Sequence, residues 1–172
     1  MKALTFLLAI LITGSACQSQ QQKQQPMTSK APANPFYSRT DTEKLHVTNA
    51  EWKKVLPPDL YAVAREAATE RPFTGKYWDA DTKGTYYCAV CGNALFRSDA
   101  KFASSCGWPS FFEPIRAGSV IYKEDNSHGM QRTEVLCGRC ESHLGHIFDD
   151  GPPPTHKRFC MNSVSLDFEP LP

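Results

Sequence analysis

The chain has 172 residues, which is enough for one domain of ordinary size and few for two. Hydrophobic residues make up 41% and charged residues 22% of it, a composition that excludes a disordered chain, a collagen and a coiled coil. Three of the 19 basic residues precede Phe36, so the rest of the chain carries 16 basic and 18 acidic residues, a net charge of about −2. That charge does not attract a phosphate backbone, so we expect no nucleic-acid partner.

The first 16 residues predict a secretory signal peptide. After Lys2, the apolar run over residues 3–12 is half the ~20 residues needed to cross a bilayer, and small residues then lead to Cys17. A cysteine at this point resembles a bacterial lipobox, in which the chain is cut before the cysteine and the cysteine receives lipid. Gly14 stands where a leucine is usual, and cleavage after Ala16 alone would leave Cys17 unmodified. We expect an exported protein of the bacterial cell envelope, lipid-anchored to a membrane at Cys17, with a soluble periplasmic or secreted protein as the alternative.

Residues 17–35 predict a disordered tether between this anchor and the folded domain. The segment is rich in Gln and then contains Pro and Ala, so it has almost no apolar surface to bury. Eighteen flexible residues reach roughly 20–25 Å, which suits a tether, although a Gln-rich tract without a role is an alternative. The folded domain is expected over residues 36–172.

Two short helices followed by strands are predicted within this domain. Thr48 and Glu51 have the spacing of a capping box, which predicts a helix that begins there and carries Trp52. A second helix is predicted over 59–66, ahead of Pro72. Short aromatic and β-branched runs between turn residues predict antiparallel strands, at 85–87, 119–122, 133–136 and 158–168.

Four of the seven cysteines predict a zinc site. Cys88 and Cys91 form one CxxC pair and Cys137 and Cys140 form another, each at the end of a predicted strand where a turn can begin. Two such turns can direct four thiolates at one Zn²⁺ ion. The 45 residues between the pairs exceed the gap of a zinc ribbon, so an inserted stretch lies between them. A disulfide framework or one redox-active CxxC pair remains the alternative.

Cys160 is the candidate nucleophile. Because side chains alternate along a strand, Arg158, Cys160 and Asn162 are expected on one face. A guanidinium beside a thiol favours the thiolate, which is the reactive form. A buried structural cysteine beside a surface arginine is the alternative interpretation.

Two other segments add to this candidate site. His143 and His146 follow the second CxxC pair and provide imidazoles that can donate or relay protons near neutral pH. Cys106 is followed by Trp108, which places an apolar wall next to a thiol. Each of these features alone would more often be structural.

The segments CxxCG, SSCGWPSF, CGRCESHLGHIFDDGP and RFCMNS, in this order, resemble the B-type methionine-R-sulfoxide reductases. The resemblance covers about residues 37–168. It implies a mainly β fold, with two antiparallel sheets in a β-tent-like sandwich and short N-terminal helices. It also implies a structural zinc ion at the four CxxC cysteines, remote from the chemistry.

The resemblance further implies a role for each candidate residue. Cys160 is the nucleophile that attacks the sulfoxide sulfur and becomes a sulfenic acid. Cys106 then forms a disulfide with it, which a thioredoxin-like donor reduces. The implied substrate is methionine-R-sulfoxide in oxidised proteins. Arg158 favours the Cys160 thiolate. Trp108 and Phe148 bind the substrate. The sulfoxide oxygen is oriented and protonated by His143, His146 and Asn162.

The sequence departs from the family pattern at two places. His156 and Lys157 stand where a glycine and an apolar residue are usual, which predicts a differently shaped loop and leaves the substrate preference open. Ser105 replaces a common glycine, which predicts altered mobility of the Cys106 loop. A zinc-binding module with a static Cys106–Cys160 disulfide and a peroxide-sensing thiol protein are the other functions considered.

Overall fold

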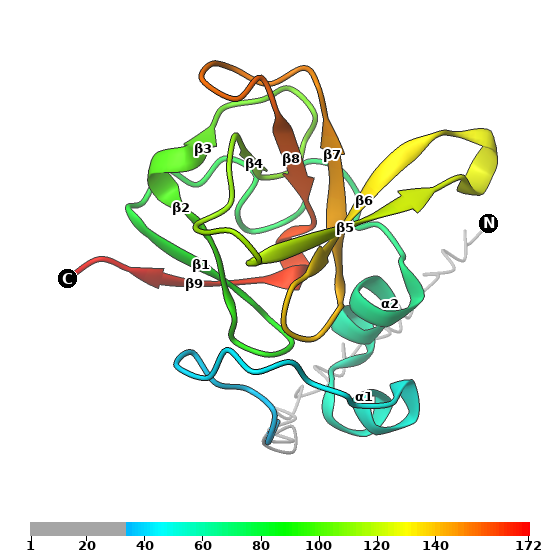
Figure 1. Ribbon diagram of the computed structural model, residues 1–172. Helices are drawn as coiled ribbons and strands as arrows, with labels where there is room; N and C mark the ends of the chain where they lie inside the picture. The colour runs from blue at the N-terminus through cyan, green and yellow to red at the C-terminus, as the bar shows by residue number, and fades with distance from the viewer. Residues whose placement is uncertain (1–33) are drawn as a thin grey trace, which may run out of the picture.

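The structure, a computed structural model, describes residues 34–172 (Figure 1). The predicted signal peptide, Cys17 and nearly all of the predicted tether lie outside the described residues. Within residues 34–172, no helix combines the length and the apolar character that crossing a membrane requires.

Both predicted helices are present near the start of the described chain. Helix α1 spans Asn49–Val55, and its capping box is complete: the Thr48 side chain accepts from the Glu51 amide, and the Glu51 carboxylate accepts from the Thr48 amide. Helix α2 spans Pro58–Glu66 and begins with a proline, which has no N–H to leave unpaired at that position. Trp52 of α1 is fully buried, so the helices pack onto the body of the domain.

The strands form two antiparallel sheets, which confirms the predicted fold class. The three-stranded sheet has the order β2-β1-β9, and the six-stranded sheet has the order β3-β4-β8-β7-β6-β5 (Figure 1). The strands of the small sheet are β1 (Gly84–Cys88), β2 (Ala94–Arg97) and β9 (Leu166–Pro170). Those of the large sheet are β3 (Lys101–Phe102), β4 (Ser110–Phe111), β5 (Val120–Asp125), β6 (Arg132–Cys137), β7 (His143–Phe148) and β8 (Arg158–Met161).

The single strand predicted over 158–168 is wrong, because the structure divides this stretch between the two sheets. Strand β8 belongs to the large sheet and β9 to the small one, with a 3-10 turn at Ser163–Ser165 between them. The amides of Ser163 and Val164 donate to the Glu70 carboxylate, at 2.6 and 2.9 Å, instead of to a neighbouring strand. A carboxylate from a distant loop therefore ends the strand.

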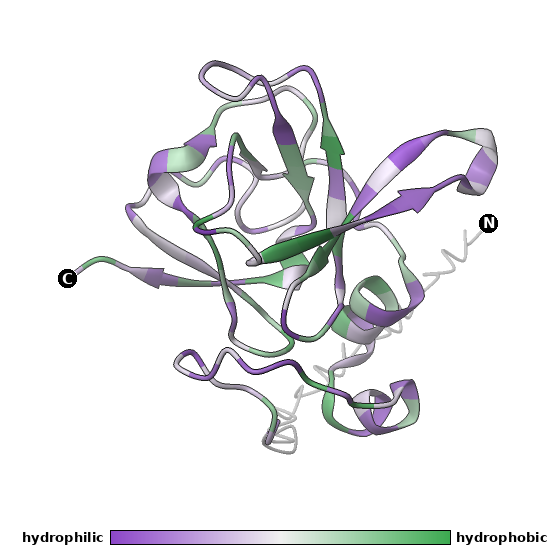
Figure 2. Ribbon diagram, viewed as in Figure 1, coloured by the Kyte–Doolittle hydropathy of each residue, from purple (hydrophilic) through white to green (hydrophobic). Residues whose placement is uncertain are grey.

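Aromatic packing between the sheets fixes which way the central strands face. Phe96 of β2, Tyr86 of β1 and Phe111 of β4 are fully buried, and the rings of Phe96 and Phe111 stack with their centres 4.4 Å apart. Burial of one such ring contributes on the order of 2–3 kcal/mol. Phe111 pairs with Phe159 of β8 on this inner face, so their neighbours along the strands face away from the core. Figure 2 shows the hydrophobic residues gathered in the central strands, whereas the end of the β5–β6 hairpin is hydrophilic.

Candidate functional site

The structure brings the four CxxC cysteines together at the junction of the two sheets. Cys88 ends β1 of the small sheet and Cys137 ends β6 of the large one. After each of them a tight turn brings the second cysteine of the CxxC pair close to the first. The Cys88 and Cys140 sulfurs lie 3.7 Å apart, the Cys91 and Cys137 sulfurs 3.6 Å apart, and all four lie within 4.8 Å of one another. The cluster therefore joins segments that are far apart in the sequence.

This cluster fits a tetrahedral metal ion. The four side chains are buried, and thiolates are the ligands of structural metal sites in proteins. Metal–sulfur bonds of about 2.3 Å in a tetrahedron place the sulfurs about 3.8 Å apart, close to the distances found here. A disulfide needs sulfurs about 2.05 Å apart, and the six cysteines of residues 34–172 are all free thiols.

Arg139, inside the second CxxC pair, ties the start of the domain to the cluster. Its side chain is 3% exposed, and its guanidinium donates to the carbonyl oxygens of Phe36 (3.0 Å), Glu43 (3.1 Å) and Cys91 (2.6 Å). It also pairs with the Asp41 carboxylate. Three carbonyls and a carboxylate satisfy most of its donors, so the residue has a structural role that the sequence did not reveal.

A second group of side chains forms one continuous row across the large sheet. The strand register pairs Lys123 with Glu134, Glu134 with His146, His146 with Cys160, and Cys160 with Ser110. Residues directly opposite one another in an antiparallel pair share a face, so the row runs over five strands on the side away from the aromatic core. The register thus brings the candidate nucleophile beside an imidazole that precedes it by 14 positions.

Cys106 reaches Cys160 from the loop between β3 and β4. The two sulfurs lie 3.4 Å apart, and the Ser104 and Ser110 hydroxyls contact the Cys106 sulfur at 3.0 and 3.4 Å. Gly107 has a φ of 85°, and a β-carbon there would lie 2.7 Å from a side-chain atom of the neighbouring loop. Glycine is therefore required for the loop to hold Cys106 in this position.

The two thiols have opposite pKa shifts. Burial and the negative charge of Cys106 raise the pKa of Cys160 to about 12, and the guanidinium of Arg158 lowers it by a smaller amount. Burial acts in the same upward direction on Cys106, but hydrogen bonds from Ser104, from Ser110 and from the Cys160 thiol lower its pKa to about 7. Arg158 thus lowers the pKa of Cys160, as predicted, but burial and Cys106 raise that pKa by more. The pair holds a single proton above neutral pH, which either sulfur can carry.

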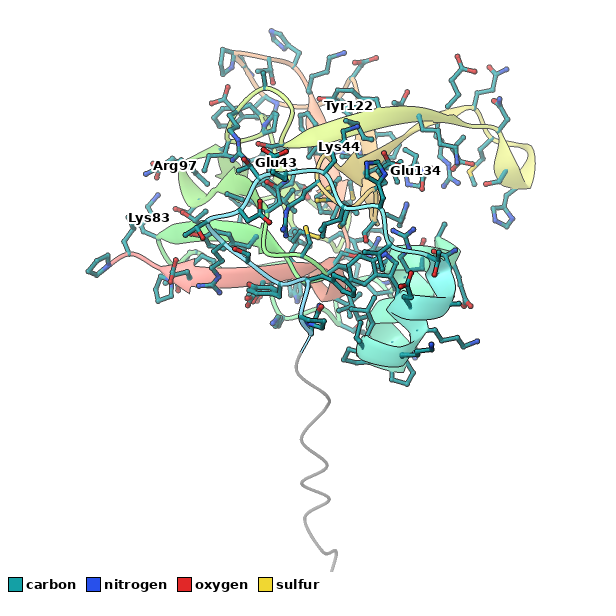
Figure 3. The ribbon with its side chains drawn as sticks, turned by 60° about the horizontal axis from the view of Figure 1, so that its bottom comes forward. Glu43, Lys44, Lys83, Arg97, Tyr122 and Glu134 are labelled. Carbon is teal, nitrogen blue, oxygen red and sulfur yellow. The ribbon has the colours of Figure 1, made fainter. Side chains whose placement is uncertain are left out.

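Each histidine of the site is held by a carboxylate from the β5–β6 hairpin. His143 Nδ1 lies 2.7 Å from the Glu134 carboxylate, and His146 Nε2 lies 2.8 Å from the Asp125 carboxylate. Figure 3 shows Glu134 on the side of the hairpin that faces the two helices. Burial lowers the pKa of His143, and the Glu134 carboxylate opposes this effect. The two carboxylates fix the rings and were not predicted from the sequence.

Glu70 links three parts of the site. Its amide donates to the Asn162 side-chain oxygen at 3.0 Å, and its carbonyl accepts from the Trp108 indole N–H at 3.2 Å. Its carboxylate receives the two amides that follow Asn162. Asn162 in turn donates to the Leu144 carbonyl at 3.1 Å. Glu70 therefore positions both the amide and the indole, and it too was missed.

A cavity of about 120 Å³ lies next to Cys160. It is lined by Thr69, Trp108, Arg132, Gly145, His146, Phe148, Cys160, Met161 and Asn162. Five of the residues predicted for the site are thus on its wall, together with Arg132, which was not predicted.

The other predicted residues lie at its edges. Cys106 contacts Cys160, and His143 lines an adjoining cavity with His146. Arg158 lies over the Phe148 ring, 4.3 Å from its centre, and pairs with Asp150.

His156, one of the two departures from the family pattern, has a φ of 57°. The backbone before β8 therefore takes a left-handed conformation without a glycine.

The chain is similar to known proteins over most of this domain. A family model described as the SelR domain matches residues 56–170, a stretch that holds both cysteine groups. A peptide methionine sulfoxide reductase MsrB from Agrobacterium fabrum is 52% identical over 128 residues, which cover 74% of this chain and 95% of that protein. Proteins of the same name from Thiobacillus denitrificans and Pseudomonas fluorescens are 56% and 55% identical, over 72% and 74% of this chain and 93% and 98% of their own lengths.

Proposed function

The chain belongs to the MsrB family of peptide methionine sulfoxide reductases, and from this premise we propose how its own residues carry the reaction. It is an oxidoreductase that returns methionine-R-sulfoxide in oxidised proteins to methionine, a repair activity.

In the first step, Cys160 attacks the sulfoxide sulfur. The sulfoxide oxygen passes to Cys160, which becomes a sulfenic acid, and the thioether of methionine is released. If Cys160 reacts as the thiolate, one proton must reach the oxygen. His146 supplies it, because its ring lines the thiol cavity and the Asp125 carboxylate holds one of its nitrogens at 2.8 Å. Cys160 becomes the thiolate by passing its proton to the Cys106 thiolate, whose sulfur lies 3.4 Å away.

In the second step, Cys106 resolves the sulfenic acid. The Cys106 thiol and the Cys160 sulfenic acid condense to a disulfide and release one water molecule, so atoms and electrons balance. The 3.4 Å between the sulfurs supports this assignment, since a small movement of the Cys106 loop brings them to bonding distance. A thioredoxin-like dithiol then reduces the disulfide and restores both thiols.

The substrate side chain occupies the cavity beside Cys160. Trp108 and Phe148 provide its aromatic walls, and the hydrogen bond from the indole N–H to the Glu70 carbonyl holds the Trp108 ring in place. Asn162 orients the sulfoxide from the opposite wall, with its own amide held between Glu70 and Leu144. The Glu134 carboxylate holds the ring of His143, which provides a second imidazole behind that of His146.

The four buried cysteines hold Zn²⁺ as a structural ion. Four thiolates complete a zinc coordination shell and leave no open position for substrate, so the ion stabilises the junction of the sheets. The chemistry of sulfoxide reduction stays with the separate Cys106–Cys160 pair.

The enzyme acts in the cell envelope, with residues 1–16 as signal peptide, 17–35 as tether and 36–172 as the catalytic domain. The support for this location is the sequence pattern that ends at Cys17, and one acyl chain alone would anchor weakly. Mass spectrometry of the mature N-terminus is expected to find several acyl chains on Cys17. An unmodified Cys17, or an uncleaved leader, would remove the anchor from the proposal.

The observation that carries the proposed mechanism is the close approach of Cys106 and Cys160 beside a cavity walled by Trp108. Its test is reduction of a peptide containing R- or S-methionine sulfoxide, with dithiothreitol as donor. We expect loss of the R form alone, with no comparable turnover of hydrogen peroxide. Steady peroxide turnover without sulfoxide reduction would favour the peroxide-sensing alternative instead.

A further inference from the structure

Arg132 lies where three cavities adjoin. Besides the 120 Å³ cavity at Cys160, it lines a cavity of about 530 Å³ together with Phe148 and another of about 580 Å³ together with His146. Phe148 and His146 are themselves shared with the thiol cavity. Arg132 thus stands at the rim of the substrate cavity, between two hollows that extend from it in different directions.

The guanidinium of Arg132 is held in place, but not all of its N–H donors have an acceptor in the described part of the chain. One of its terminal nitrogens donates to the Asp125 carboxylate at 2.6 Å and to the Ser127 hydroxyl at 3.4 Å. Its Nε is buried and has no hydrogen-bond partner among residues 34–172. That atom is too enclosed to meet a ligand, but the other terminal nitrogen, Nη1, is not enclosed and makes no hydrogen bond within residues 34–172, so it can donate to an acceptor on a ligand.

Three other polar groups on the cavity wall each have a protein partner. The Trp108 indole N–H donates to the Glu70 carbonyl, Asn162 donates to the Leu144 carbonyl, and one His146 nitrogen is held by Asp125. A methionine sulfoxide side chain that reaches Cys160 leaves its own backbone at the rim, where carbonyl oxygens seek donors. The two adjoining cavities are large enough to receive the residues before and after it.

We propose that Arg132 donates a hydrogen bond to a backbone carbonyl of the substrate beside the oxidised methionine, and that this contact makes the site selective for sulfoxide within a peptide chain. The inference rests on the proposed function and adds a specificity-determining residue to it. Because Asp125 already holds the guanidinium in place, little side-chain freedom is lost when the peptide binds. The acceptor is a peptide carbonyl and carries no charge.

Arg132 also touches Asp125, which holds His146, so an effect on the chemistry must be separated from an effect on peptide binding. Two substrates separate them: N-acetyl-methionine-R-sulfoxide methylamide, which has backbone carbonyls, and an R-configured alkyl methyl sulfoxide, which has none. For Arg132→Leu we expect kcat/KM on the capped substrate to fall at least about 10-fold, mainly through KM. On the alkyl sulfoxide we expect a change of less than about 2-fold.

Three variants complete the experiment. Arg132→Lys keeps a cationic N–H donor beside Asp125 but loses the planar fork of the guanidinium, so it should show the same selectivity for substrate with a smaller loss. Asp125→Asn acts on the His146 side and should slow both substrates alike. Arg97→Leu removes an exposed arginine on the side of the molecule away from the hairpin end and should alter neither (Figure 3).

Equal losses on both substrates for Arg132→Leu would overturn the inference and assign Arg132 to the support of His146. No loss on either substrate would also overturn it. If the unsubstituted protein reduced neither sulfoxide, the proposed function itself would fail, which is a distinguishable result. Thermal unfolding shows whether each variant keeps its fold. If Arg132→Leu does not, the ratio of the losses that Arg132→Lys shows on the two substrates decides the question.

Discussion

The sulfur of Cys106 lies 3.4 Å from that of Cys160, although 54 positions separate the two residues in the chain. Pairing of β4 with β8 and the tight turn at Gly107 bring them together. This contact couples the protonation of the two thiols and, in the proposed mechanism, their oxidation.

Substitution of the two cysteines should have different effects. Cys160→Ser removes the proposed nucleophile, so even a single turnover should disappear. Cys106→Ser should still release about one methionine per enzyme and leave a sulfenic acid at Cys160, while thioredoxin-driven turnover falls by at least about 100-fold. The measurements are methionine released without reductant and the steady rate with thioredoxin. A full thioredoxin-driven rate in Cys106→Ser would show that another route regenerates Cys160.

The pH dependence of thiol reactivity should follow the pair. With the pKa of Cys106 at about 7 and that of Cys160 at about 12, the pair loses one proton near neutral pH and keeps the second. Alkylation by iodoacetamide should therefore rise as the pH increases through about 7, level off above 8, and fall away below 6. Turnover should also decline below pH 7. An alkylation rate that kept rising steeply from pH 8 to pH 10 would contradict the single-proton description.

Loss of the metal should unfold the domain without a direct effect on the redox step. Chelation, or Cys88→Ser, leaves buried thiols without their shared ligand, and we expect a loss of at least about 3 kcal/mol of stability. For a domain of this size that corresponds to roughly 10 °C in the melting temperature. Melting curves and metal content should fall together. A metal-free protein with an unchanged melting curve would exclude a stabilising ion.

Glu70→Ala should damage the site through the loop that it holds. The amides of Ser163 and Val164 lose their carboxylate, which should lower the free energy of unfolding by about 1–3 kcal/mol. Because Asn162 directly precedes these amides, kcat/KM for sulfoxide should fall about 10-fold while the alkylation rate of the thiols stays within 2-fold. Glu113→Ala, at an exposed glutamate, is the control and should change neither. Equal losses in both assays would point to general unfolding.

The left-handed backbone at His156 predicts how that position responds to substitution. At a φ of 57°, glycine is unstrained, so His156→Gly should be neutral or stabilise by up to about 1 kcal/mol. A β-branched side chain is poorly tolerated in this conformation, so His156→Val should destabilise by about 1–2 kcal/mol. Urea unfolding of the two variants measures the contrast. A more stable Val variant would mean that the loop adopts another conformation in solution.

The sequence predicted the parts of the site that are local in the chain. A CxxC turn needs only four neighbouring residues, so its geometry follows from its spacing, as does the capping box at Thr48. Asp125 and Glu134 were not predicted because only the pairing register of the strands places them beside the histidines. That register depends on the hairpin as a whole. Glu70 escaped because a loop carboxylate binds backbone amides, which carry no sequence signal. The same contact divides the 158–168 stretch between two sheets.

The thiol cluster at the sheet junction has one more effect, on which disulfides the protein can form. Its sulfurs lie 3.6–3.7 Å apart in pairs, nearly as close as the 3.4 Å of Cys106 and Cys160, so with no bound ion an oxidant could crosslink either group. An ion held by all four thiolates protects them, because a coordinated thiolate is a poorer nucleophile toward another sulfur than a free one. With the ion bound, mild oxidation should yield one disulfide, Cys106–Cys160. After chelation, peptide mapping should find a mixture of pairings, so the metal also determines which thiols are available for redox chemistry.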